Sequence, residues 1–218
     1  MSTLEVLSIE TLVHGRVIVR RGRGVAGAVL AGYHGYAESA DVMLERLQSI
    51  PGTETATLVA IQGLNRFYRG RSEEVVAGWM TRQDRETAIA DTVRYVDAAL
   101  DAVLAVHSSD PAIVHVGFSQ GAASAFRAAV RGRRRSVAVI AVGGDVPPEL
   151  LADESARFPR VLLVRGDSDD WYTQPKLDAD LASLRRRGAS ATPKTVAAGH
   201  EWTAAVADAA SAFLTSGF

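Results

Sequence analysis

A serine between two glycines is the residue whose surroundings most favour nucleophilic chemistry. Gly117-Phe-Ser-Gln-Gly121 matches the pattern Gly-x-Ser-x-Gly, in which a serine lies on a tight turn between a strand and a helix. Glycines are needed there because neighbouring backbone comes close to the turn. The apolar run 112–116 precedes the motif and the alanine-rich run 122–130 follows it. We therefore predict that Ser119 is a nucleophile; the alternative is that it only caps the helix.

A serine hydroxyl needs a base to take its proton, and only one histidine follows Ser119 in the chain. This residue, His200, lies in Ala198–Trp202, between the last expected strand and the last expected helix. In chains with this serine turn the order is serine, acid, histidine, so we predict that His200 is the base. The alternative is an ordinary loop histidine. Two earlier histidines, His107 and His115, are interpreted as structural or solvated.

The acid is expected after a strand between serine and histidine. The run 161–164 is followed by Arg165-Gly-Asp-Ser-Asp-Asp170. Asp169, three residues after Gly166, is the predicted acid, which accepts the histidine N–H and stabilises the imidazolium. Asp167 and Asp170 are alternatives, and Asp145 is a weaker one.

An oxyanion needs two N–H donors directed at it. One is expected from the amide of Gln120, directly after the nucleophile, and the other from the loop after an early central strand. Tyr33-His-Gly-Tyr-Ala37 is such a loop, with Tyr36 as the predicted donor and His34 as a scaffold residue. A simple strand-to-helix turn is the alternative for this segment.

Short apolar runs alternate with helical patterns, which favours a mainly parallel sheet flanked by helices on both faces. Together with the Gly-x-Ser-x-Gly turn, this predicts the α/β-hydrolase fold. The opening residues are expected to form an antiparallel edge hairpin, with strands over 6–13 and 16–20. Residues 63–83 are expected to be a long irregular connection, and no large lid is expected after 137–142. Further strands are predicted over 25–31, 57–62, 112–116, 137–142, 161–164 and 192–197, and helices over 39–48, 84–106, 119–130, 174–187 and 201–214.

Composition excludes several classes of function. The chain has 218 residues, which suits a single domain over 1–218, and a formal net charge of −1, which gives no overall attraction to nucleic acid. It has no cysteine, no apolar run near the roughly 18 residues of a membrane span, and no signal-peptide pattern over 1–10. We expect a cytoplasmic monomer or homodimer that binds no nucleic acid and inserts into no membrane.

The segment 22–27 matches the dinucleotide pattern Gly-x-Gly-x-x-Gly. That site needs a strand before the glycines and a helix after them. Here a strand is expected to follow, so a turn is favoured. We expect no cofactor and no metal.

Four stretches, in this order along the chain, resemble the phospholipase/carboxylesterase group of α/β-hydrolases, which includes acyl-protein thioesterases. They are His34-Gly-Tyr-Ala-Glu38, Gly117-Phe-Ser-Gln-Gly121, Gly166-Asp-Ser-Asp169 and Gly199-His200. The resemblance implies cofactor-free hydrolysis of carboxylic esters or thioesters by Ser119, Asp169 and His200. The chain departs from thioesterase members at Ala37 and Ala122, where they usually have glycine. It also departs at Asp169-Asp-Trp-Tyr-Thr173, where they usually have Asp-x-x-Val-Pro. These departures count against acyl-protein or lysophospholipid substrates.

Four aromatic residues are expected to contact the substrate: Trp79, Trp171, Tyr172 and Trp202. For Trp171, Tyr172 and Trp202 the alternative is that they pack the loops onto the sheet. With no lid, the site favours small or flexible esters. Rival interpretations are a peptidase or lactonase with the same triad, and a non-catalytic binding protein with this fold.

Overall fold

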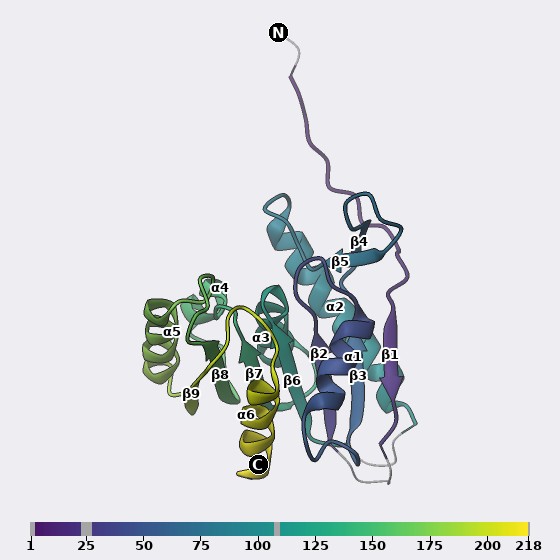
Figure 1. The fold of residues 1–218 in the computed structure, drawn as a ribbon. Helices are drawn as coiled ribbons and strands as arrows, with labels where there is room; N and C mark the ends of the chain where they lie inside the picture. Colours follow the sequence, from purple (N-terminus) through teal and green to yellow (C-terminus); the bar gives the residue numbers. More distant parts are fainter. Residues whose placement is uncertain (1–2, 23–27, 107–109, 218) are drawn as a thin grey trace.

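The central element is a seven-stranded sheet (Figure 1). It is seen in a computed structural model that describes residues 3–22, 28–106 and 110–217, so His107, residues 25–27 of the predicted strand 25–31 and most of the segment 22–27 lie outside the described residues. The strand order is β1-β3-β2-β6-β7-β8-β9. β1 is antiparallel to β3, and the other neighbouring pairs are parallel. The strands are β1 (Val17–Arg20), β2 (Val29–Tyr33), β3 (Thr57–Ile61), β6 (Ile113–Phe118), β7 (Ser136–Val142), β8 (Arg160–Gly166) and β9 (Ala191–Val196).

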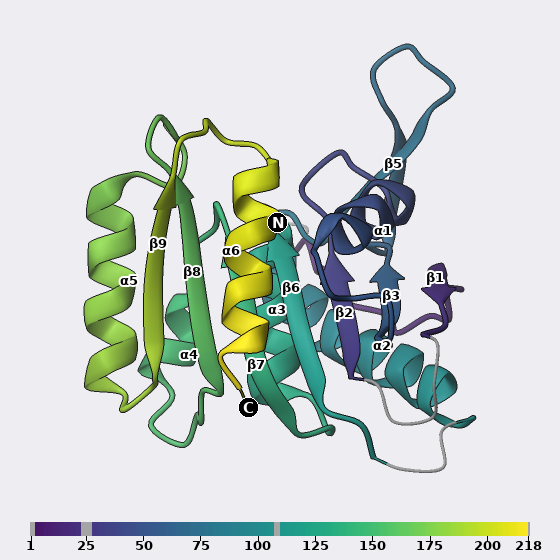
Figure 2. The same cartoon turned by 60° about the horizontal axis from the view of Figure 1, so that its bottom comes forward.

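Helices cover both faces of the sheet, as Figure 2 shows, and the predicted fold class is confirmed. On one face α1 and α6 pack through apolar side chains such as Leu47 and Phe213. On the other face α2, α3 and α5 pack through side chains such as Leu100, Phe126 and Leu184. The helices of the described residues are α1 (Ala40–Ser49), α2 (Arg85–Leu104), α3 (Gln120–Arg131), α4 (Pro148–Ala152), α5 (Gln174–Arg186) and α6 (Ala204–Thr215). Within the described ranges, none of these helices has the length and apolarity needed to cross a membrane.

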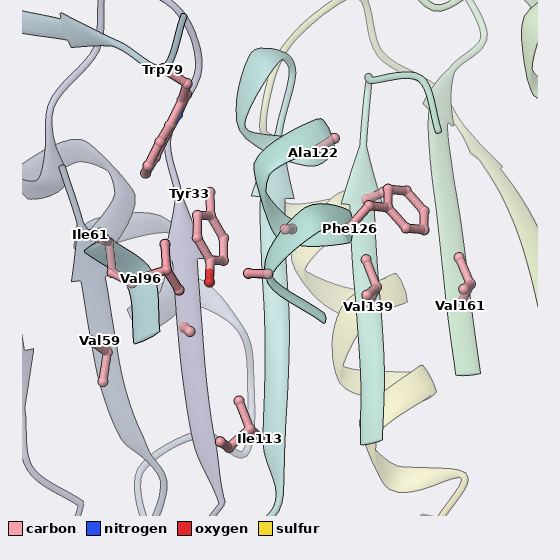
Figure 3. Packing of buried hydrophobic residues seen from close by; sticks show 14 of the residues in the cluster. Tyr33, Val59, Ile61, Trp79, Val96, Ile113, Ala122, Phe126, Val139 and Val161 are labelled. Carbon is pink, nitrogen blue, oxygen red and sulfur yellow. The ribbon is translucent and has the colours of Figure 1, made fainter. Parts of the chain in front are cut away.

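The central strands consist mostly of apolar residues because helices cover both of their faces. All residues of β2, β3, β6 and all but the first of β8 are buried, which is typical of parallel strands between two helical layers. Figure 3 shows the core under α2 and α3, where Trp79 lies beside Tyr33 and Phe126 reaches toward β7 and β8. The rings of Trp79 and Tyr33 are 5.5 Å apart. This core fixes the strand ends that carry the site.

The N-terminal hairpin predicted from the sequence is wrong. Residues 3–16 have no regular secondary structure, and β1 pairs with β3 instead of with a strand over 6–13. The apolar side chains between Leu4 and Val13 are exposed. Alternating residues form a strand only where a neighbouring strand accepts their backbone hydrogen bonds, and these residues have no such neighbour among those described.

The prediction that residues 63–83 are irregular is also wrong. They contain an antiparallel hairpin of β4 (Asn65–Tyr68) and β5 (Val75–Gly78), which projects from the sheet beside α1 (Figure 2). Ala37 donates its amide to the Ala77 carbonyl at 3.0 Å, and Ala77 donates to the Glu38 carbonyl at 2.8 Å. The hairpin therefore holds the loop that follows β2.

A buried histidine in β6 is structural, in agreement with its interpretation from the sequence. Nδ1 of His115 lies 2.7 Å from the Tyr33 hydroxyl, and Nε2 lies 2.8 Å from the Ser136 hydroxyl. Burial lowers the pKa of His115 to about 3. The ring is therefore neutral in the folded protein near neutral pH.

This burial predicts a specific loss of stability in acid. The unfolded chain protonates His115 near pH 6.5, whereas the folded chain resists protonation until pH falls to about 3. The stabilisation is complete above about pH 7.5 and declines as pH falls, by about 2 kcal/mol between pH 6.5 and pH 4.5. Urea unfolding across this range measures the decline. Over the same pH range, the free energy of unfolding of His115→Asn should fall by about that much less than that of the wild type. An equal fall in both proteins would show that His115 is protonated as easily in the folded chain as in the unfolded one.

Candidate active site

Five loops at the carboxyl ends of parallel strands form the site, where folds of this kind place their ligands. β6 ends at Phe118 and leads to Ser119. β8 leads to Asp169, β9 leads to His200, and β2 leads to the loop that contains Tyr36. The fifth loop, after β7, begins with Gly143.

The turn at Ser119 is strained. Its φ of 53° and ψ of −121° lie in a region that residues with a Cβ rarely adopt. The amide of Ser119 donates to the Val142 carbonyl at 2.8 Å, which ties the turn to the end of β7. A non-glycine residue keeps such a strained conformation only where contacts around it hold the backbone in place. In this turn the conformation directs the serine side chain away from the sheet.

The glycines of the motif are required by contacts with backbone. A Cβ at Gly117 would overlap the Gly121 carbonyl oxygen, and a Cβ at Gly121 would overlap the Tyr33 and His34 carbonyl oxygens. Backbone at these strand ends cannot move aside as the end of a flexible side chain can. The glycines therefore let α3 begin directly against β2.

We expect Gly121→Ala to lower the free energy of unfolding by about 3 kcal/mol or more, or about 6–12 °C in Tm. Thermal unfolding followed by circular dichroism measures the change. Gly199→Ala is the matched control, because the nearest atom to a Cβ there is 3.9 Å away. A Gly121→Ala protein as stable as the control would show that the close packing of α3 on β2 is not required.

Three predicted catalytic side chains form a continuous chain of hydrogen bonds. Nε2 of His200 lies 2.8 Å from Oγ of Ser119, and Nδ1 of His200 lies 2.9 Å from Oδ2 of Asp169. An ionised carboxylate only accepts, so Nδ1 carries the proton. In the neutral ring, Nε2 then has a free lone pair directed at the Ser119 hydroxyl. This arrangement can remove the proton from Ser119.

The carboxylate of Asp169 is almost fully buried and is held in place by backbone amides. Oδ1 accepts from the amides of Trp171 at 2.8 Å and Tyr172 at 2.9 Å. Burial alone would raise the pKa of Asp169, but hydrogen bonds from Tyr172, His200 and Trp171 outweigh it and hold the pKa below its ordinary value. Asp169 is therefore charged and has a fixed orientation.

The competing aspartates do not face His200. Asp167 and Asp170 are exposed, and Oδ1 of Asp167 accepts from the Ser168 hydroxyl at 2.9 Å. Asp145 is mostly exposed and lies 3.6 Å from the ammonium group of Lys176. Of the four aspartates considered from the sequence, the structure brings Asp169 to the histidine.

Of the two predicted oxyanion donors, Tyr36 lies in the loop after β2 and Gln120 is the first residue of α3. Within the described ranges, the main-chain amides of Tyr36 and Gln120 have no hydrogen-bond partner. The side chain of Gln120 accepts from the Trp79 amide at 2.9 Å and donates to the Met80 carbonyl at 3.1 Å. This clamp leaves the amide of Gln120 free and explains the use of glutamine after the serine.

His34 shapes the loop that contains Tyr36. Its Nε2 accepts from the Gly63 amide at 2.9 Å, so the proton is on Nδ1, which donates to the Gly35 carbonyl at 2.7 Å. Burial lowers the pKa of His34, which favours this neutral form. Glu38 adds support, because it accepts from the Gly35 amide at 2.7 Å and pairs with both terminal nitrogens of Arg46 at 2.6 and 2.7 Å.

A cavity of about 650 Å³ opens beside Ser119 and His200. Two of the four aromatic residues predicted to contact substrate line it. Trp171 is 73% exposed, with its ring 6.4 Å from the His200 ring. Tyr172 is buried, and its hydroxyl donates to Asp180 at 2.9 Å.

The other two aromatic residues do not line this cavity, and their contact with a substrate stays a prediction. Trp79 is buried in the core, where its indole N–H donates to the His34 carbonyl at 2.8 Å. Trp202 donates to the Ser49 hydroxyl at 3.1 Å, at the end of α1. Both tryptophans pack loops onto the sheet, which for Trp202 was the stated alternative.

Sequence reasoning missed the contribution of the loop after β7. Gly143 has a φ of 61° and lies against the His200 ring, and a Cβ at Gly144 would overlap the Ser119 carbonyl oxygen. Paired glycines at the end of a predicted strand were a usable signal. It also missed Arg85 and Arg127, which line the cavity. Within the described ranges no cluster of three His, Asp or Glu side chains could hold a metal ion.

The sequence matches no protein-family model and no curated protein sequence. Solved structures, in contrast, match over nearly the whole chain. Esterase PE8 is 25% identical, with a TM-score of 0.75 over 94% of this chain and 99% of that one. Acyl-protein thioesterase 2 of Zea mays is 18% identical, with a TM-score of 0.71 over 93% and 99%. A carboxylesterase of Bacillus cereus is 16% identical, with a TM-score of 0.71 over 94% and 95%.

These neighbours belong to the group that the sequence motifs resemble, and they share its sheet and helical layers with this chain. By its sheet and by these structural neighbours, the chain has the α/β-hydrolase fold.

Proposed function

We propose that this chain is a serine hydrolase that cleaves carboxylic esters or thioesters of small or flexible substrates. Its likeness to esterases and a thioesterase supports an esterase-type hydrolase. The single observation that carries the finer proposal is the hydrogen-bonded series from Asp169 through His200 to Ser119. It lies at a strained turn and opens onto a cavity of about 650 Å³.

In the first half-reaction, Oγ of Ser119 attacks the carbonyl carbon of the ester while its proton passes to Nε2 of His200. The carbonyl oxygen becomes an oxyanion that accepts from the amides of Tyr36 and Gln120. The bond to the leaving oxygen or sulfur then breaks, and Nε2 of His200 donates its proton to that atom. Asp169 stays ionised and stabilises the imidazolium between these steps.

In the second half-reaction, water attacks the acyl-enzyme. His200 takes a proton from the water, the bond to Oγ of Ser119 breaks, and Oγ recovers a proton from Nε2. The products are a carboxylic acid and the free enzyme. No step requires a redox change, and the protons balance over the two halves.

A substrate panel tests this proposal. Initial rates with p-nitrophenyl acetate and butyrate, an acyl-thioester, an aminoacyl amide and a lactone are compared, with Ser119→Ala as the control. Turnover of esters or thioesters above the other classes is expected. Faster cleavage of the amide or lactone would favour the rival peptidase or lactonase. A folded wild type that turns over nothing would favour a non-catalytic binding protein.

The cytoplasmic location and the monomeric or homodimeric state stay predictions of the sequence.

A further inference from the structure

One face of α3 continues the site away from the nucleophile. Gln120, Ala123 and Arg127 follow one another at helical spacing, and all three line the cavity beside Ser119. Seven residues of helix rise about 10.5 Å, and helical side chains lean toward the helix N-terminus. The guanidinium of Arg127 is thus presented to the cavity within about two turns of Ser119.

This guanidinium is costly to bury. Arg127 is 3% exposed, and burial lowers its pKa despite its hydrogen bond to Glu149. Its Nε donates to Oε1 of Glu149 at 2.7 Å, and one terminal nitrogen lies 3.6 Å from the Met80 sulfur. Among the described residues, Glu149 is the only carboxylate bonded to it. The terminal N–H groups therefore keep donor capacity for another anion.

A second arginine shares the same carboxylate. Arg85 donates to Oε2 of Glu149 at 3.2 Å, so two guanidinium groups share one carboxylate, whose side chain is 17% exposed. Arg85 also lies 3.5 Å from Glu86, whose side chain is 83% exposed and therefore well screened by water. Arg85 and Arg127 line the cavity, whereas Glu149 does not. The two arginines therefore form part of the cavity wall, and the carboxylate that they share does not.

The other charges of the cavity wall are already balanced. Lys176 lies 3.6 Å from Asp145 and donates to the Trp171 carbonyl at 2.8 Å. Glu38 pairs with Arg46 through both oxygens. Arg85 and Arg127 share Glu149, and the other carboxylate near Arg85, that of Glu86, is exposed to water, so this end of the cavity keeps a net positive character.

We propose that the cavity binds esters that carry a carboxylate, with Arg127, assisted by Arg85, holding that carboxylate while Ser119 attacks the ester carbonyl. This inference rests on the proposed esterase function and names its substrate class. Guanidinium groups bind carboxylates with paired, directional hydrogen bonds, and the buried setting strengthens them. A neutral substrate of the same shape would leave the Arg127 donors without a partner.

The test compares matched anionic and neutral esters. Monoethyl glutarate and monoethyl adipate are compared with the ethyl esters whose distal acid is an amide, and ethanol release is followed. A second pair, 4-acetoxybutanoate and 4-acetoxybutanamide, places the charge on the alcohol part. In the wild type, kcat/KM for the anionic member of at least one pair should exceed that of its neutral partner by roughly 10- to 100-fold.

Three variants separate recognition from structural support. Arg127→Gln should abolish the preference for the anionic ester while keeping turnover of the neutral one. Glu149→Gln should increase the preference, because the competing carboxylate is gone. Arg134→Gln is the control, since Arg134 pairs with Asp101 away from the cavity and should leave the preference unchanged. An equal fall in both rates in Arg127→Gln, or no preference in the wild type, would overturn the proposal.

A binding measurement separates this inference from the proposed function. Glutarate and adipate should give a calorimetric binding signal with Ser119→Ala, and the double variant Ser119→Ala/Arg127→Gln should lose it. Ester turnover without any dependence on charge would contradict the carboxylate site but agree with the proposed esterase function. If the protein binds dicarboxylates through Arg127 but hydrolyses no ester, the carboxylate site is supported and the proposed esterase function is contradicted.

Discussion

Ser119→Ala is expected to lower kcat/KM for the best ester of the panel by about four orders of magnitude or more. The hydroxyl oxygen that accepts the acyl group is lost, and His200 has no nucleophile to activate. Alanine fits the same turn without added volume, so the protein should keep its Tm. Initial-rate assays with purified protein, together with thermal unfolding, measure both quantities.

Ser168→Ala is the matched control for this change. Ser168 is exposed in the loop that carries Asp169, and its hydroxyl bonds only to Asp167 among the described side chains. Its activity should stay within about twofold of wild type, because surface substitutions away from special features have small effects. Ser119→Ala activity that stays near the wild-type level would mean that another residue is the nucleophile.

The second large effect is expected at the acid. Asp169→Asn keeps one oxygen for the amides of Trp171 and Tyr172, so the loop should hold its shape. The new amide group then faces Nδ1 of His200 as a donor, which favours the tautomer with its proton on Nε2. That tautomer cannot accept from Ser119. We expect a loss in kcat of roughly 10⁴-fold, the size that this change has in a serine protease.

The neighbouring aspartates give a stringent control. Asp167→Asn and Asp170→Asn alter exposed side chains that do not contact His200, and each should cost less than about threefold in kcat. The three variants are measured with the same ester at the same pH. Equal losses in all three would mean that the loop as a whole, rather than the Asp169 carboxylate, supports His200.

The sequence predicted the elements around the site well because local signals there agree with one another. Ser119 lies between an apolar strand and an alanine-rich helix, so the motif and its flanks require the same turn. His200 follows Ser119 without competitors of its own kind. Among the aspartates of one short loop, by contrast, spacing favoured Asp169, but only geometry shows which carboxylate turns toward the histidine.

The N-terminal residues and the β4–β5 hairpin were mispredicted because their structure depends on partners far along the chain. Residues 6–13 alternate as a strand does, yet no described strand lies beside them. The β4–β5 hairpin is held by hydrogen bonds to the loop after β2, some 40 residues earlier than Ala77. Pairing of this kind is decided by tertiary structure, which periodicity does not report.

The roles of the tryptophans and of the arginine pair also depend on contacts that sequence patterns do not report. Tryptophan is a residue type expected in a pocket wall, but Trp79 and Trp202 both lie outside this cavity and donate hydrogen bonds that hold loops in place. Arg127 reads in the sequence as one more arginine on α3. Its role depends on Glu149 and Arg85, which lie beside it only in the folded chain.

Labelling with a fluorophosphonate probe, read by intact-protein mass spectrometry and peptide mapping, tests the central claim most directly. The wild type should gain the mass of one phosphonyl group, located on the peptide that contains Ser119, and Ser119→Ala should gain none. His200→Gln should react far more slowly, because Ser119 then lacks its base. A folded wild type that stays unlabelled, or a label on another residue, would contradict the account.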